Sequence, residues 1–146
     1  MSEQKAGTPA GQNPLSVKVR SSGFTEYCGL KFTEIGDERC VMTCPLRPEV
    51  LNPGGIAHGG VIATLSDVCT SAMALQADGG KRRIVTQSCS IHYLSPGTGE
   101  ALRCEARVIR KGRRVCVVQA DCFSGDGTLC AVATYEIAYL NVPREE

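Results

Sequence analysis

Hydrophobic and polar residues follow two different periods along the chain, and these periods separate helical from extended segments. Over residues 57–76, apolar side chains recur at helical spacing, at Val61, Leu65, Val68 and Ala72. The second half of the chain instead alternates with a period of two, which predicts strands over 83–94, 100–110, 114–123 and 128–140. The last of these segments is apolar on both faces, which favours a covered central strand.

The first part of the chain carries weaker patterns. Residues 15–30 are weakly amphipathic and predict an N-terminal helix, whereas 31–35 and 39–44 predict two strands joined by a Gly36-Asp37-Glu38 turn. Residues 45–55 contain three prolines and two adjacent glycines, which predict a loop. The order of elements indicates an α+β fold in which one long helix packs on an antiparallel sheet.

Composition adds limits on the class of protein. The chain has 146 residues, of which 42% are hydrophobic, so we expect a single domain over 15–142 and a disordered tail over 1–14. Sixteen Lys and Arg residues oppose fifteen Asp and Glu residues, a balance that argues against a broad nucleic-acid-binding face. No segment reads as a secretory signal or a membrane span, so we expect a cytoplasmic protein with no membrane partner.

Nine cysteines are many for this length. The odd count and the missing secretory signal argue against a disulfide scaffold, and the spacing gives no zinc pattern. Cys104, Cys116 and Cys122 alternate in step with apolar neighbours, so we interpret them as small core residues of a protein in a reducing cytoplasm. We expect neither a metal nor a cofactor.

The stretch from Asn52 to Asp67 carries the candidate chemistry. His58-Gly59-Gly60 stands where the long helix should begin, Asp67 follows about two turns later, and no Lys, Arg or Glu lies between Asn52 and Asp67. Taken singly, the glycines could form a turn, the histidine could be structural and the aspartate could be solvated. Together they offer helix-start N–H groups to a developing oxyanion and a carboxylate on an otherwise apolar helix.

These residues resemble those of the hotdog-fold acyl-CoA thioesterases of the phenylacetate-degradation type, from about residue 15 to residue 140. The matching features are Asn52, His58-Gly59-Gly60, Ala63-Thr64-Leu65, Asp67 and Tyr93-Leu94-Ser95-Pro96. The resemblance implies a long helix wrapped by a curved antiparallel sheet. It also implies subunits that pair side by side, with active sites at the dimer interface.

The resemblance also implies roles for single residues. Asp67 would act as general base on water or as nucleophile, and the Gly59 N–H would polarise the thioester carbonyl. Asn52 and His58, from the subunit opposite Asp67, would orient the thioester and the leaving sulfur. Thr86 stands where some relatives carry a serine that helps to hold the water. The chain has no G-x-S-x-G motif, which argues against a serine hydrolase.

A basic cluster is the second notable feature, formed by Arg110, Lys111, Gly112, Arg113 and Arg114. Alone it could be a solvated hairpin turn. With a CoA ligand in view, the nucleotide phosphates become its partner, and Lys81-Arg82-Arg83 is a weaker candidate for that task.

The sequence therefore predicts an acyl-CoA thioesterase that acts on small to medium acyl or aroyl groups. We expect it to work as a homodimer with shared sites or as a dimer of dimers. Two alternatives remain open, a hotdog hydratase or dehydratase and a non-catalytic acyl-CoA sensor.

Overall fold

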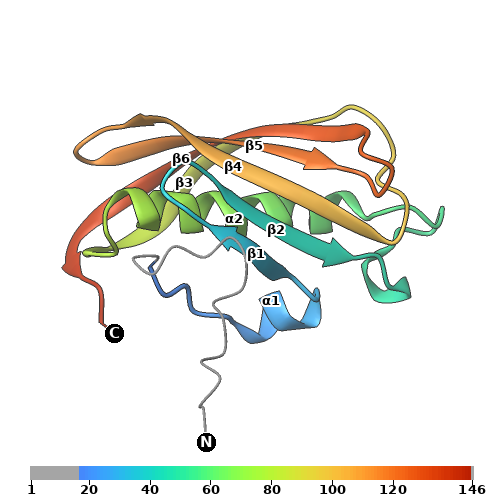
Figure 1. Cartoon of the computed structure of the whole chain (residues 1–146), viewed down its shortest axis with the longest axis horizontal. Helices are drawn as coiled ribbons and strands as arrows, with labels where there is room; N and C mark the ends of the chain where they lie inside the picture. Colours follow the sequence, from blue (N-terminus) through green and yellow to red (C-terminus); the bar gives the residue numbers. More distant parts are fainter. Residues whose placement is uncertain (1–16, 146) are drawn as a thin grey trace, which may run out of the picture.

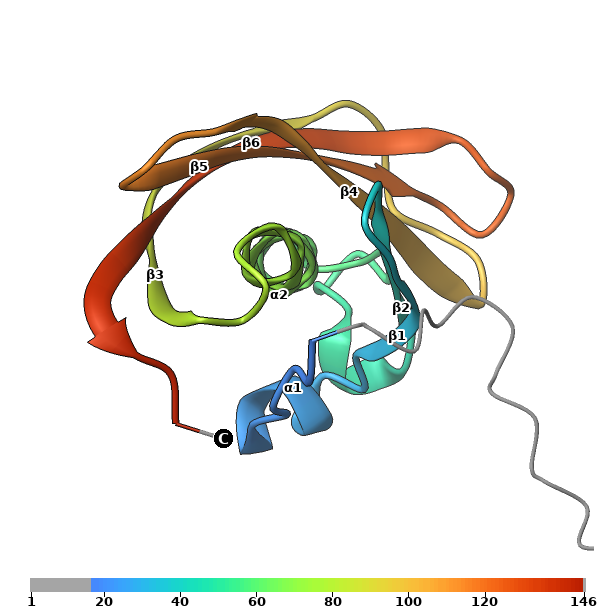
Figure 2. The same cartoon turned by 60° about the vertical axis from the view of Figure 1, so that its left-hand side comes forward.

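The computed structural model describes residues 17–145 and consists of one long helix inside a curved sheet (Figures 1 and 2). The helices are α1 (Gly23–Tyr27), the 3₁₀ helix η1 (Pro48–Val50) and α2 (Gly59–Ala77). The strands are β1 (Lys31–Ile35), β2 (Cys40–Pro45), β3 (Arg82–Tyr93), β4 (Ala101–Lys111), β5 (Val115–Phe123) and β6 (Leu129–Pro143). All strand pairs are antiparallel, in the order β1-β2-β4-β5-β6-β3. The predicted α+β class is confirmed.

Helix α2 is the centre of the hydrophobic core. Leu65, Cys69, Ala72 and Met73 are almost fully buried, because the concave face of the sheet encloses this side of the helix (Figure 2). By length and composition alone, α2 is long and apolar enough to cross a membrane. This corrects the expectation that no segment of the sequence resembles a membrane span. Most of the helix is buried inside the domain, as expected for the core helix of a folded protein.

Alternation along the strands places small side chains against α2. On β5, Cys116, Val118, Ala120 and Cys122 are buried while their neighbours are partly exposed. This confirms the prediction that these cysteines serve as core residues. Eight of the nine cysteines are buried, and all nine are unpaired. Strand β6 lies between β5 and β3, as predicted for a central strand, but its outward-facing side chains are partly exposed, so it is covered on one face only.

Strand β3 forms one edge of the sheet. Among the described strands it pairs only with β6, and a bulge interrupts the register between Thr86 and Ser88. Most of its side chains are exposed, including Val85 at 47% and Tyr93 at 54%. A long exposed edge strand presents unpaired N–H and C=O groups, which makes it a template for pairing with another chain.

The N-terminal prediction was largely wrong. Within residues 17–30 only Gly23–Tyr27 is helical, and residues 17–22 have no regular structure. Helix α1 buries no side chain, so the weak amphipathic pattern had no packing to extend it. The predicted loop at 45–55 contains η1, and the other predicted elements lie within about three residues of the observed bounds. The tail predicted over 1–14 lies outside the described residues.

Candidate active site

The start of α2 is built around its capping residue. The Nδ1 atom of His58 accepts a hydrogen bond from the Gly60 N–H at 2.9 Å. A Cβ atom at position 60 would lie only 3.0 Å from this nitrogen, so the cap favours glycine there. Because Nδ1 accepts, a neutral His58 ring carries its proton on Nε2. His58 therefore has a structural task besides its predicted role in orienting the substrate.

The first N–H groups of α2 form the predicted oxyanion site. N–H groups in the first turn of a helix have no carbonyl partner within the helix, and the helix dipole gives this end partial positive charge. Gly59 is partly buried and lines a surface hollow, which leaves room for a ligand beside the helix start. The arrangement can stabilise an oxygen atom that gains negative charge.

Asn52 shapes the loop that leads to this helix start. Its Oδ1 atom accepts hydrogen bonds from the N–H groups of Gly54 at 2.9 Å and Ile56 at 3.3 Å. Its own N–H donates to the Ile56 carbonyl at 2.8 Å. This Asx-type turn occupies the side-chain oxygen, so the amide NH₂ group is the part of Asn52 that can contact a substrate.

Tyr93 is a site residue that the sequence reasoning missed. Its hydroxyl donates to the Gly59 carbonyl at 3.0 Å, and its ring lies about 3.5 Å from where a Cβ of residue 59 would stand. Tyr93, Gly59, Asn52 and Leu94 line a hollow of about 290 Å³. The residue was noted only as part of the matching Tyr-Leu-Ser-Pro run, because its contact with the helix start depends on how β3 passes α2.

Asp67 lies half-buried on the side of α2 that the sheet leaves open. The Thr86 hydroxyl, on β3, donates to its Oδ1 atom at 2.6 Å. Asp67 also lines a cavity of about 440 Å³, together with Val68 and Ser71. The structure thus brings together Asp67 and Thr86, 19 residues apart in sequence. One carboxylate oxygen is held while the other can face a ligand.

The structure does not bring Asp67 to the helix start within one chain. Asp67 follows Gly59 by eight positions, and at 1.5 Å per residue this is about 12 Å along the helix axis. The two hollows share no lining residue. A single chain therefore presents two half-sites, one with a carboxylate and one with a helix-start N–H.

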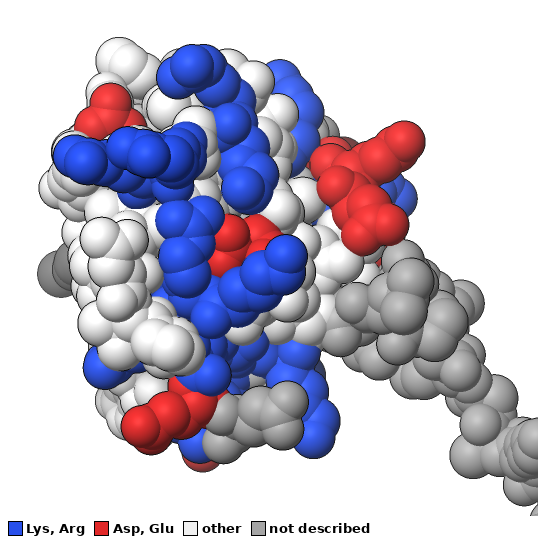
Figure 3. Space-filling model, turned by 90° about the vertical axis from the view of Figure 1, so that its left-hand side faces the viewer, with Lys and Arg blue, Asp and Glu red and all other residues white. Residues whose placement is uncertain are grey.

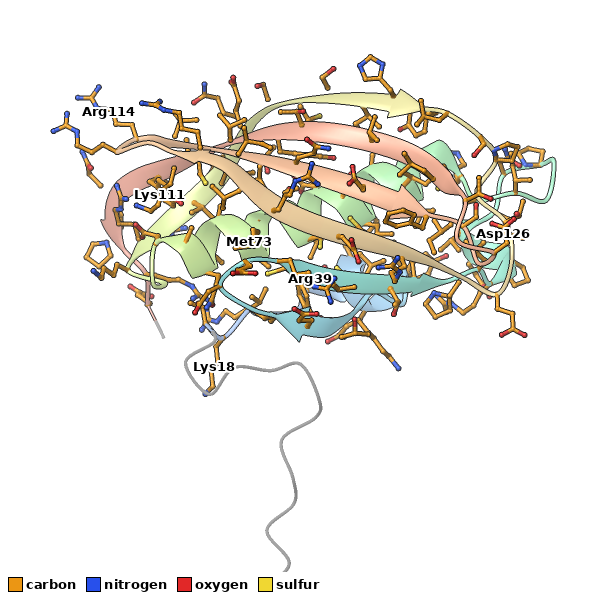
Figure 4. The ribbon with its side chains drawn as sticks, turned by 45° about the horizontal axis from the view of Figure 1, so that its top comes forward. Lys18, Arg39, Met73, Lys111, Arg114 and Asp126 are labelled. Carbon is orange, nitrogen blue, oxygen red and sulfur yellow. The ribbon has the colours of Figure 1, made fainter. Side chains whose placement is uncertain are left out.

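The predicted phosphate-binding cluster forms the β4–β5 turn. Gly112 is required there because a Cβ would lie 2.8 Å from the Val115 carbonyl oxygen. Arg110, Arg113 and Arg114 are exposed. The turn lies at the end of the molecule that holds the C-terminal end of α2, and basic side chains gather there (Figures 3 and 4).

Lys111 is the partly engaged member of this cluster. Its Nζ atom lies 3.9 Å from Asp78 Oδ1 and 5.3 Å from the centroid of the Tyr139 ring. Asp78 also binds Arg82, whose Nη2 lies 2.6 Å from Asp78 Oδ1. Burial raises the pKa of Asp78, but the hydrogen bonds and charge of Arg82 outweigh it and lower the net pKa. Arg82, a weaker phosphate candidate, is thus committed to a structural ion pair.

The buried cysteines are poor nucleophiles. Burial raises the pKa of the Cys40 thiol to about 12 and that of the Cys44 thiol to about 11. Cys69 is fully buried on the side of α2 that faces the sheet, where its thiol lies 3.5 Å from the Cys40 carbonyl oxygen. Across residues 17–145, no three His, Cys, Asp or Glu side chains are grouped to hold a metal ion.

Comparison with known proteins gives the family. Residues 54–131, more than half of the chain, match the Thioesterase superfamily. A protein of Saccharolobus solfataricus that bears an esterase name is 31% identical over 108 residues, which cover 74% of this chain and 76% of that protein. The chain belongs to the thioesterase superfamily. It is a thioester hydrolase, and its helix within a curved six-stranded sheet is the predicted hotdog fold.

Two further relatives of this thioesterase carry information on ligands. The 1,4-dihydroxy-2-naphthoyl-CoA hydrolase of Escherichia coli is 23% identical over 114 residues, which cover 78% of this chain and 84% of that enzyme. A Bacillus halodurans protein whose crystal structure contains CoA aligns with a TM-score of 0.74 and 27% identity. The alignment covers 83% of this chain and 78% of that protein.

Proposed function

We propose that this protein hydrolyses acyl-CoA thioesters to a free acid and CoA, with Asp67 as the catalytic carboxylate. The observation that carries the proposal is the Asp67–Thr86 pair at the wall of a cavity on the open side of α2. The CoA bound to the Bacillus halodurans relative and the activity named for the Escherichia coli relative support CoA as the thiol.

The chemistry follows from the two half-sites. Asp67 removes a proton from a water molecule that attacks the thioester carbonyl, or attacks that carbon itself. The carbonyl oxygen gains negative charge and is stabilised by the Gly59 N–H. The C–S bond then breaks, and the CoA thiolate leaves with its electron pair and takes up a proton. If Asp67 is the nucleophile, the acyl–Asp67 anhydride that this leaves is hydrolysed by water, which releases the acid and restores the carboxylate. The amide of Asn52 and the Nε2–H of His58 are placed at the same helix start to orient the thioester and the leaving sulfur.

A homodimer would complete the site. Two observations support a homodimer. The half-sites of one chain lie about 12 Å apart along α2, and the outer edge of β3 has no partner among the described strands. Thr86 contacts Asp67, and Tyr93 contacts Gly59, so β3 touches both half-sites. Two β3 strands that pair antiparallel about a twofold axis near Cys89 and Ser90 would set Thr86 of one subunit opposite the partner's Tyr93. This register would join each carboxylate to the other subunit's helix start.

The nucleotide end of CoA would be held by the β4–β5 turn. Arg110, Arg113 and Arg114 are exposed cations around a tight glycine turn and suit phosphate oxygens. Lys111 already has Asp78 near it, so its contribution is smaller. The reducing cytoplasm is the proposed location, since eight buried free thiols would be stable there.

The rival proposal is a sensor that binds acyl-CoA without cleaving it. Release of free thiol from a panel of aliphatic and aromatic acyl-CoA substrates distinguishes the two. We expect many turnovers per subunit, and Asp67→Asn should lower kcat by about 10²–10⁴-fold. The matched control is Asp126→Asn, an exposed aspartate in the β5–β6 turn whose side chain accepts the Thr128 N–H, and it should keep wild-type turnover (Figure 4). Stoichiometric binding without thiol release would favour the sensor.

A further inference from the structure

The cavity beside Asp67 extends along the second half of α2. Asp67, Val68, Ser71 and Leu75 form its helix wall. From Asp67 to Leu75 the helix rises by about 12 Å, so the cavity reaches well beyond the reacting carboxylate. Its volume of about 440 Å³ lies in the usual range of small-molecule sites.

The opposite wall comes from both ends of the described chain. The Val17 N–H donates to Gln76 Oε1 at 2.8 Å, and the Arg144 guanidinium donates to the Lys18 carbonyl. The Arg144 N–H donates in turn to the Lys81 carbonyl at 3.1 Å. These bonds fasten the N- and C-terminal segments to each other and to the C-terminal end of α2, on the side that the sheet leaves open (Figure 2).

The end of the cavity away from Asp67 is rich in arginine. Arg83 and Arg144 line it, and so does Arg20. Within residues 17–145 no salt bridge involves Arg83 or Arg144, and the Arg144 guanidinium donates to a neutral carbonyl, that of Lys18. Glu145 is the acidic residue at this end of the lining, so positive charge remains in excess.

The arginine that precedes Arg83 on β3 is held within the fold, unlike Arg83. Arg82 is bound to Asp78 and stacks on Tyr139 at 4.3 Å, so its charge is used within the fold. Arg83 is the next residue on β3, at the point where the register with β6 shifts between Arg82 and Ile84, and it lines the cavity. An exposed arginine in a cavity wall suits a ligand carboxylate, which it can bind through two N–H donors.

We infer that the cavity takes the acyl group of the thioester and favours an acyl group with an apolar body and a carboxylate at its far end. Val68, Leu75 and Ile84 contact the body, and Arg83 and Arg144 bind the carboxylate. The inference rests on the proposed thioesterase function and names its substrate class. It gives Arg83 a different task from the nucleotide contact that its sequence position suggested.

Paired substrates test this inference. Adipyl-CoA and hexanoyl-CoA have equal chain length and differ in the terminal carboxylate, as do suberyl-CoA and octanoyl-CoA. We expect kcat/KM to be higher for the carboxylate-bearing member of a pair. Arg83→Gln should lower that preference by about tenfold, Arg83→Lys should keep part of it, and Arg83→Glu should abolish it. Arg107→Gln, which removes an exposed arginine paired with Asp121 on β5, is the matched control and should change nothing.

The same comparison with pantetheine thioesters separates an acyl carboxylate from the phosphates of CoA. If Arg83 binds the acyl end, its substitution acts on the carboxylate preference whether or not the nucleotide is present. An effect that disappears with the nucleotide, or an equal loss for neutral and carboxylate-bearing acyl groups, overturns the inference. Hydrolysis of neutral thioesters without any preference overturns it too and leaves the proposed function intact. Failure to hydrolyse every thioester would instead contradict the proposed function.

Discussion

Two half-sites about 12 Å apart on one helix predict that each active site uses two subunits. Asp67→Asn removes the carboxylate from one half-site. His58→Ser removes the imidazole from the other and keeps a side-chain oxygen that can accept the Gly60 N–H bond. Serine is preferable to alanine because loss of the helix cap would cost about 0.5–2 kcal/mol of stability. Each variant alone should form inactive dimers.

Mixed dimers of these two variants should recover activity. One of the two sites then combines an intact Asp67 with an intact His58 from the partner, and the other site carries both substitutions. A mixed dimer purified through two different tags should therefore show about half of the wild-type turnover, since one of two equivalent sites is intact. Thiol release from acyl-CoA measures this directly.

The reciprocal combination is the control. A chain that carries both substitutions, paired with a wild-type chain, should be inactive, because each site then has one defective half. If every site lay within one chain, the two results would be exchanged. The doubly substituted mixed dimer would then keep half of the activity, and the singly substituted one would have none. That pattern would refute the reasoning from the helix geometry.

Three further predictions follow from the same structure. Replacing Lys111 and Arg113 by alanine should raise KM for acyl-CoA with little change in kcat, because contacts to the nucleotide are equal in the ground and transition states. The effect should shrink with a pantetheine thioester, and an equal loss on both substrates would contradict it. Cys69→Ala should keep wild-type kcat, since this thiol faces the sheet, and a large loss would show that it takes part in catalysis. Asp78 has a lowered pKa in the fold, so it stabilises the protein above the ordinary aspartate pKa of about 3.9 and loses this contribution as the pH falls through the folded value. In urea unfolding, the stability advantage of the wild type over Asp78→Asn should therefore shrink below about pH 4, and a constant difference from pH 7 to pH 3 would contradict it.

The sequence alone determined most of the fold. Burial of one face of a strand or helix produces a periodic pattern of apolar residues in the sequence. The period-two alternation in 83–140 and the helical spacing in 57–76 therefore predicted these elements. The segment at 15–30 had no comparable pattern, and its helix was overestimated because nothing in the core packs against α1. The cysteines on β5 were placed correctly because each lies in step with Val118 and Ala120.

The candidate site was only partly determined by sequence. The order of Asn52, His58, Gly59 and Asp67 marks one loop and one helix, but sequence order does not state which of them meet in space. Tertiary structure decided that Thr86 reaches Asp67, because β3 returns alongside α2 after the turn that ends the helix.

The contacts that bear on specificity also came from the tertiary structure. Tyr93 covers Gly59, and Arg83 faces the cavity while Arg82 binds Asp78. These contacts depend on the curvature of the sheet and on which face each strand residue takes, and both are fixed only when the sheet closes around the helix.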